Sequence, residues 1–119
     1  MQNKIDSLRV RMKDNNVDLV VLGPGTHMNW LLGFNPYPDE RPCMLLIGKE
    51  KEAFLMPSVN AEDARKRTDI AINSWKDDDG PEQALKEALV DICESAAKHI
   101  AIDEAMRSHF ALIVIEALP

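Results

Sequence analysis

The sequence predicts an α/β fold in which helices flank a mixed sheet of five strands. Short apolar runs alternate with segments of helical spacing, and two neighbouring apolar runs are separated by a polar spacer of hairpin length. Strands are expected over residues 18–22, 43–47, 53–56, 70–75 and 99–103. Helices are expected over residues 3–15, 27–32, 59–66, 81–97 and 106–118.

The first two elements are a helix and a buried strand. Ile5, Leu8 and Met12 have the i, i+3, i+7 spacing of one helical face. The aliphatic run at residues 18–22 is short, and the Gly-Pro-Gly sequence at residues 23–25 follows it. This combination predicts a strand that enters a tight turn.

A short helix and an irregular loop come next. Thr26 is expected to cap the helix and Gly33 to end it. The three prolines within residues 35–42 are incompatible with regular structure, so this segment is predicted to be a loop. It carries Tyr37 and Arg41, and an arginine near an aromatic side chain suits contact with a carboxylate or a neighbouring subunit. An ordinary connecting loop is the alternative.

The middle of the chain predicts an antiparallel hairpin followed by a helix and a strand. The polar residues 48–52 separate the two hairpin strands, and Ser58 is the expected cap of the helix. The basic run at residues 65–67 lies where this helix should end, which is a favourable place for cations. Residues 70–75 alternate in polarity, as a strand does.

The last third predicts a helix, a strand and a second helix. Pro81 suits a first helical turn, and apolar residues keep helical spacing through residue 97. The acidic run at residues 77–79 lacks the spacing of a calcium loop and is interpreted as the entry to this helix. Residues 99–103 predict a strand, and the apolar positions of residues 106–118 share one helical face.

Length and charge exclude several classes of protein. The 119 residues are enough for one domain with a core of its own. The 14 basic and 20 acidic residues give a net charge of 14 − 20 = −6, and the basic residues are scattered, which weighs against nucleic-acid binding. The N-terminus has no apolar signal-peptide core, and no apolar stretch approaches the length of a membrane span. We expect a soluble cytoplasmic protein that binds neither nucleic acid nor a membrane.

The sequence predicts no catalytic residue and no metal ligand in this chain. Cys43 and Cys93 each lie in an apolar stretch and are expected to be reduced and buried. His27 lies near a helix start, where a capping or loop role is expected. His99 and Asp103 are four residues apart, but on a strand they would be ~13 Å apart, too far to share one ion.

Several segments together resemble the amino-terminal domain of the creatinase, prolidase and Xaa-Pro aminopeptidase family. The best signature is residues 29–34, where family members usually carry tyrosine and threonine in place of Trp30 and Leu32. Trp75 and the strand at residues 99–103 fall in the family's order, and the resemblance covers nearly the whole chain. It implies a creatinase/prolidase N-terminal domain fold with a ribonuclease H-like motif and, in the family, six strands.

This resemblance also implies a division of labour between two domains. The family's chemistry lies in a C-terminal catalytic domain that binds two divalent metal ions, such as Mn, through Asp, His and Glu ligands, and those positions are absent from this chain. Residues 1–119 would then be a non-catalytic domain that lacks its last edge strand and has no cofactor of its own. It would limit substrate access, contact its own catalytic domain and take part in a homodimer.

Within the resemblance, Arg41 lies where creatinase-like members place an arginine that meets a substrate carboxylate across the dimer. Tyr37 and Trp30 are the other residues expected to contact the substrate or a neighbouring subunit. The parent protein would be an Xaa-Pro dipeptidase or aminopeptidase, whereas this fragment alone would be inactive. Two alternatives remain: the same domain of a creatinase-like C–N hydrolase, and a freestanding interaction module.

Overall fold

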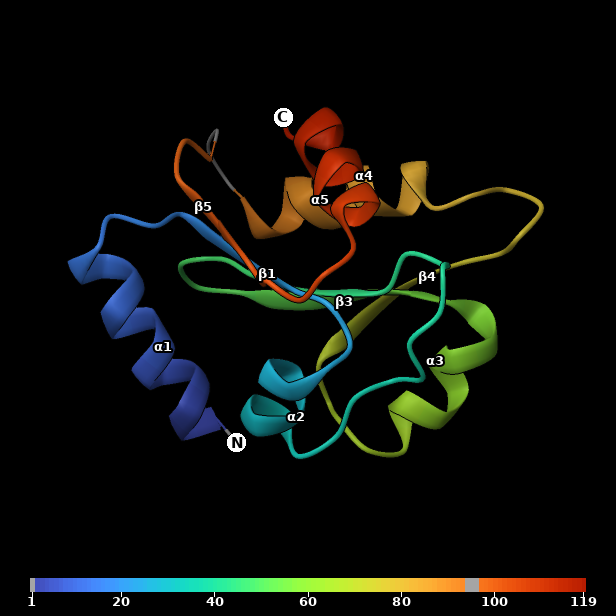
Figure 1. Cartoon of the computed structure of the whole chain (residues 1–119), viewed down its shortest axis with the longest axis horizontal. Coiled ribbons are helices and arrows are strands. Elements are labelled where there is room, and N and C mark those ends of the chain that lie inside the picture. Colours follow the sequence, from blue (N-terminus) through green and yellow to red (C-terminus); the bar gives the residue numbers. More distant parts are fainter. Residues whose placement is uncertain (1, 94–96) are drawn as a thin grey trace.

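A computed structural model describes residues 2–93 and 97–119 of the chain (Figure 1). It contains the ten predicted elements in the predicted order. The helices are α1 (Gln2–Asp14), α2 (Thr26–Leu32), α3 (Ser58–Arg65), α4 (Glu82–Ile92) and α5 (Ser108–Ala117). The strands are β1 (Leu19–Leu22), β2 (Met44–Ile47), β3 (Glu52–Pro57), β4 (Ala71–Trp75) and β5 (Ile100–Ile102).

The strands form one mixed sheet in the order β4-β3-β2-β1-β5. β2 is antiparallel to both of its neighbours, whereas β1 pairs in parallel with β5 and β3 pairs in parallel with β4. Four strands therefore point the same way, and their carboxyl ends lie at the same end of the sheet as the start of β2. The predicted mixed sheet and the predicted hairpin are both confirmed.

Helices cover both faces of the sheet. Figure 1 shows α1, α2 and α3 on one face and α4 and α5 on the other. Alternate strand residues point into the two layers, so both sides of each central strand are buried and its sequence is continuously apolar. The layer under α1 to α3 contains Val20, Leu22, Leu45, Ile47, Phe54 and Met56. The layer under α4 and α5 contains Leu19, Val21, Met44, Leu46, Ala53 and Leu55.

The two predicted side-chain caps are wrong. Thr26 is the first residue of α2, whose N-cap is Gly25, and no side chain caps that helix. Ser58 is likewise inside α3, and its Oγ donates a hydrogen bond of 3.1 Å to the carbonyl of Trp75 instead. A serine hydroxyl can cap a helix by accepting a backbone N–H, or it can donate to a backbone carbonyl that has no other partner. Here it donates to the carbonyl of Trp75 at the end of β4. The predicted end of α2 is confirmed, because Gly33 adopts the left-handed conformation with φ 85°.

Helix α4 is shorter than predicted. It ends at Ile92, because Cys93 has extended backbone angles (φ −108°, ψ 90°) that place its side chain in the core under α4 and α5. Apolar spacing alone cannot distinguish a buried residue that continues a helix from one that leaves it. Residues 94–96 of the predicted helix lie outside the described residues, and Ala97 is not helical.

Both cysteines are free and buried, as predicted. Cys43 belongs to the core layer under α1 to α3 and Cys93 to the layer under α4 and α5, so the sheet separates the two thiols. The basic residues 65–67 at the end of α3 are exposed, also as predicted. None of the helices in the described part of the chain has the length and apolar character that a membrane span requires.

Candidate functional site

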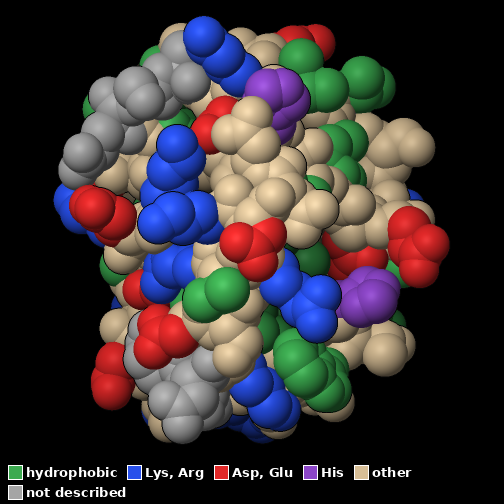
Figure 2. Space-filling view, turned by 90° about the vertical axis from the view of Figure 1, so that its left-hand side faces the viewer, with side chains coloured by type: hydrophobic (Ala, Val, Ile, Leu, Met, Phe, Trp, Pro, Cys, Tyr) green, Lys and Arg blue, Asp and Glu red, His purple; other side chains and the backbone are tan. Residues whose placement is uncertain are grey.

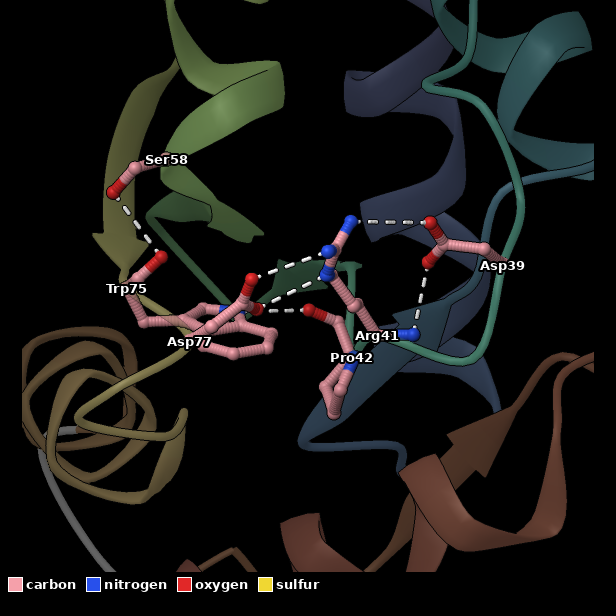
Figure 3. Close-up of polar contacts among 6 residues, drawn as sticks. All are labelled: Asp39, Arg41, Pro42, Ser58, Trp75 and Asp77. Atoms are coloured by element: carbon pink, nitrogen blue, oxygen red, sulfur yellow. Dashed lines mark hydrogen bonds and ion pairs between the residues drawn. The ribbon is translucent and has the colours of Figure 1, made fainter.

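The proline-rich loop before β2 and the turn after β4 meet at one end of the sheet. β2 starts at this end because it runs opposite to its neighbours, and β4 finishes there. Arg41 lies two residues before the strand predicted at residues 43–47, and Asp77 lies just after β4. The sheet topology therefore brings together two side chains that are 36 positions apart (Figure 3).

The guanidinium of Arg41 is held by two carboxylates. Its Nε donates to Oδ1 of Asp77 at 3.0 Å and its Nη2 donates to Oδ2 of the same residue at 3.1 Å, which is the bidentate geometry of a guanidinium with a carboxylate. Nη1 lies 3.6 Å from Oδ2 of Asp39. The Arg41 side chain is 36% exposed and the Asp77 side chain is 60% exposed. The bidentate donor pair of Arg41, Nε and Nη2, is called the Arg41 fork below, and it lies at the protein surface.

Trp75 fixes the base of the loop. Its buried indole Nε1–H donates to the carbonyl of Pro42 at 2.9 Å, and its own carbonyl accepts the Ser58 hydroxyl (Figure 3). The Arg41 backbone N–H donates to Oδ1 of Asp39 at 2.9 Å, which closes a local turn. The loop is therefore positioned by the Trp75 side chain of β4 on one side and by its own aspartate on the other.

The two aromatic residues predicted beside Arg41 are both exposed. Tyr37 is 76% exposed, and Trp30 on α2 is 63% exposed. The Lys4 ammonium lies 4.6 Å from the centre of the Trp30 ring and donates to its carbonyl at 2.8 Å. In the part of the chain that the structure describes, no hydrogen bond or ion pair joins either aromatic residue to Arg41.

Sequence reasoning missed both carboxylates that hold Arg41. Asp77 was assigned to a helix-entry turn, which is where it lies, but nothing local in the sequence indicates a partner 36 residues away. Asp39 could have been found, because an aspartate two residues before a backbone N–H commonly forms such a turn.

A second polar group lies at the carboxyl end of β5. The side chain of Asp103 is 2% exposed, and its Oδ1 accepts the Ala105 N–H at 3.0 Å. Nε2 of His27, in the first turn of α2, lies 3.9 Å from that oxygen and 3.9 Å from Oε1 of Glu104. Across the described residues, no group of three or more His, Cys, Asp or Glu side chains is placed to hold a metal ion.

Asp18 anchors the start of β5 to the start of β1. Its Oδ2 accepts the backbone N–H groups of Lys98 at 2.8 Å and His99 at 3.1 Å, and Lys49 Nζ lies 3.1 Å from Oδ1. The backbone donors, followed by Lys49, lower the pKa of Asp18 to about 2.

The surroundings of the two thiols raise their pKa values, whereas those of Asp18 lower its pKa. Burial, together with the negative charge of Asp39, raises the pKa of Cys43 to about 12. Burial, followed by the negative charge of Asp18, also raises the pKa of Cys93. Neither environment activates a nucleophile, because a reactive cysteine needs a lowered pKa.

The chain matches the family described as the Creatinase/Prolidase N-terminal domain over residues 4–119. It belongs to this family. The creatinase/prolidase N-terminal domain fold predicted from the sequence is therefore confirmed, with five strands in the sheet that the described residues form.

Solved structures share the fold of this creatinase/prolidase N-terminal domain. A proline dipeptidase from Streptococcus pneumoniae TIGR4 has 19% identity and a TM-score of 0.85 over 96% of this chain and 84% of that chain. The corresponding domain of an X-Pro dipeptidase from Streptococcus pyogenes has 18% identity and a TM-score of 0.87 over 98% and 88%. A dipeptidase from Pyrococcus horikoshii OT3 has 22% identity and a TM-score of 0.82 over 96% of this chain but 32% of its own. No curated protein matches the chain.

Proposed function

We propose that this chain is the non-catalytic N-terminal domain of a metal-dependent Xaa-Pro dipeptidase or aminopeptidase-like hydrolase. The observation that supports this most directly is the family match over residues 4–119. The similar Pyrococcus horikoshii dipeptidase is about three times as long, with this fold covering 32% of it. In this proposal the domain pairs with a catalytic domain, shapes the access of substrate to it and contributes contacts to a homodimer.

The metal ions of the proposed enzyme belong to the catalytic domain. That domain would bind two divalent ions, such as Mn, and would carry out the hydrolysis. The contribution of the present chain is to bind and orient substrate at the boundary of the active site. Its surface fork at Arg41 is the part best suited to this task, because a planar guanidinium recognises a carboxylate through two parallel hydrogen bonds.

In this proposal Asp77 occupies the place that a substrate carboxylate would take. Nε and Nη2 of Arg41 are already aligned as a bidentate donor pair, and Asp39 supports the guanidinium from its other side. Because the Asp77 side chain is 60% exposed, it can turn into solvent when a competing carboxylate arrives. The fork would then select substrates with a free carboxylate, as a dipeptide has.

The test uses the protein in which this domain is joined to its catalytic domain. With Mn supplied, we expect cleavage of Xaa-Pro dipeptides, and we expect Arg41→Ala to lower kcat/KM by about tenfold or more, because hydrogen bonds to charged groups contribute ~1.5–3 kcal/mol. Arg65→Ala is the matched control, since Arg65 is exposed at the end of α3. Unchanged kcat/KM for Arg41→Ala would exclude the role of the fork. Hydrolysis of creatine-type substrates without cleavage of Xaa-Pro peptides would instead favour a creatinase-like enzyme.

A further inference from the structure

A cavity lies between α1 and the turn that joins β2 to β3. Its volume of about 450 Å³ is within the range of small-molecule sites, about 300–1,000 Å³. In Figure 1 both α1 and this turn are on the left, and Figure 2 faces that side, where Lys and Arg side chains gather with Asp and Glu among them. Among the described residues that line the cavity, none belongs to β4 or β5, the two outer strands of the sheet.

The apolar wall of the cavity is built by the end of α1. Asn16 adopts the left-handed conformation with φ 58°, and its N–H donates to the carbonyl of Lys13 at 3.2 Å. The N–H of Val17 donates to the carbonyl of Met12 at 2.8 Å, which completes a Schellman motif. Val17 and Met12 belong to the same apolar cluster and both line the cavity. Val10, which is 61% exposed, extends this apolar surface along the helix.

The charged residues that line the cavity are mostly basic. They are Arg9, Lys13 and Lys49, together with the acidic residue Asp6, so the lining carries a net charge of +2 in a chain whose net charge is −6. Lys49 is paired with Asp18, a residue outside the described lining. Lys13 makes no hydrogen bond or ion pair with any other described residue. The cavity therefore suits a negatively charged ligand.

Arg9 has donor capacity that the described contacts leave unused. Its side chain is 16% exposed, and its Nε donates to the carbonyl of Gly48 at 3.0 Å. Nη2 lies 3.0 Å from Oε1 of Glu52, but both atoms are buried and neither has a hydrogen-bond partner among the described residues. A guanidinium has five N–H donors, and a buried donor without an acceptor is unfavourable. An acceptor in the cavity would therefore stabilise Arg9.

We propose that this cavity binds a small amphipathic organic acid, with an apolar chain or ring and one carboxylate or sulfonate group. The apolar part would cover Val10, Met12 and Val17. The acidic group would accept hydrogen bonds from Arg9 and Lys13, which are four residues apart and therefore lie on the same face of α1.

This site is separate from the Arg41 fork. Lys49, at the cavity, follows the end of β2, whereas Arg41 precedes the start of the same strand. The two sites therefore lie at opposite ends of the sheet. The proposal does not rest on the proposed function, and it can be tested on the 119-residue chain without any catalytic domain.

The first experiment titrates the folded chain with anilinonaphthalene sulfonate, an apolar anion whose fluorescence rises when it is bound. We expect one site per chain with a Kd on the order of 100 µM, which corresponds to ordinary binding efficiency for a ligand of this size. Octanoate should displace the probe. Octanol and octyltrimethylammonium have similar apolar chains without the negative charge, and they should compete about fivefold more weakly or less well still.

Two charge variants separate the ligand from the helix end. Arg11 and Lys13 both lie in the last turn of α1, where cations favour the helix, but Lys13 lines the cavity and Arg11 is not among the described lining residues. Lys13→Gln should weaken probe binding about threefold to fivefold, the effect of one exposed ion pair. Arg11→Gln makes the same change of net charge and should leave binding unchanged. Equal effects of the two variants would overturn the proposal.

An apolar-wall variant tests the other half of the site. Val10→Asp places a carboxylate on the wall and should weaken binding of the probe and of octanoate about tenfold. Val59→Asp, at a residue of α3 that is 72% exposed, is the matched control. Circular dichroism checks that both variants are folded. Binding to Val10→Asp that equals binding to the control would exclude this wall as the ligand site.

Amide chemical shifts locate the bound ligand. In a titration with octanoate, the amides of Lys13, Val17 and Lys49 should shift and saturate together, while those of Arg41 and Asp77 stay in place. Shifts at Arg41 without shifts at Val17 would assign the carboxylate to the Arg41 fork and would overturn the proposal. Failure to saturate, or an absence of shifts at both places, would overturn it as well. None of these outcomes bears on whether the full enzyme cleaves Xaa-Pro peptides.

Discussion

The guanidinium of Arg41 holds the carboxylate of Asp77 through two parallel hydrogen bonds of 3.0 and 3.1 Å. The pair connects the loop before β2 to the turn after β4, two segments that the sheet topology brings to the same end. It also places an aligned donor pair at the surface, where the Asp77 side chain is 60% exposed. In the proposed function this donor pair would recognise an acidic group of the substrate.

The contribution of this pair to stability is expected to be small. A double-mutant cycle with Arg41→Ala and Asp77→Ala should give a coupling energy of about 0.2–1 kcal/mol, because both side chains are partly exposed and water screens their attraction. The measurement is the free energy of unfolding in urea for the four proteins. A coupling energy of zero would contradict this prediction, and one well above about 1 kcal/mol would show that the pair is less screened by water than its exposure indicates.

The buried hydrogen bond of Trp75 should matter more. Trp75→Phe keeps an aromatic ring but leaves the Pro42 carbonyl without its donor, so we expect a loss of about 1–3 kcal/mol in the free energy of unfolding. Trp30→Phe makes the same chemical change at a side chain that is 63% exposed. That control should stay within about 0.5 kcal/mol of the parent protein. Equal losses for the two variants would contradict the assignment.

The anchoring carboxylate of Asp18 predicts an acid-sensitive contribution to stability. Its pKa is lowered from 3.8 to about 2 in the folded protein, so the folded state favours the charged form. This contribution is complete above pH 3.8 and disappears as the pH falls toward 2. Thermal unfolding of Asp18→Asn between these limits should show a shallower fall in Tm than the parent protein shows. Asp78→Asn, at an exposed carboxylate, should follow the parent protein.

The two thiols should be unreactive while the protein is folded. Burial raises the pKa of Cys43 to about 12 and also raises the pKa of Cys93, so little thiolate exists at pH 8. We expect mass spectrometry to find neither residue alkylated by iodoacetamide in the native protein and both alkylated in denaturant. Rapid native labelling of Cys43 would show that its segment opens to solvent.

Much of the fold could be predicted because it depends on local patterns. The alternation of apolar runs with helical spacing placed all ten elements, and the polar residues 48–52 identified the hairpin. Strand order was beyond these patterns, because pairing between β1 and β5 depends on contacts across most of the chain. The end of α4 could not be predicted, because an apolar residue such as Cys93 fits the sequence pattern whether its backbone is helical or extended.

The candidate site was less accessible to sequence reasoning. Arg41 could be singled out from its loop, but its partner Asp77 could not, because a salt bridge between distant segments leaves no local signal. The proximity of His27 and Asp103 was missed for the same reason. Ser58 shows a related difficulty: a residue type suited to a helix cap was used to satisfy a strand carbonyl instead.

The position of β5 has a consequence for the order of folding. Asp18 and His99, which join the starts of β1 and β5, are 81 positions apart. During synthesis the β2–β3 hairpin and its helices leave the ribosome well before β5 does, so β1 has a partner on one side only until residues 100–102 have emerged. The docking of β5 and α5 is therefore expected to be a late step, and until then nascent chains would carry an unsatisfied apolar strand.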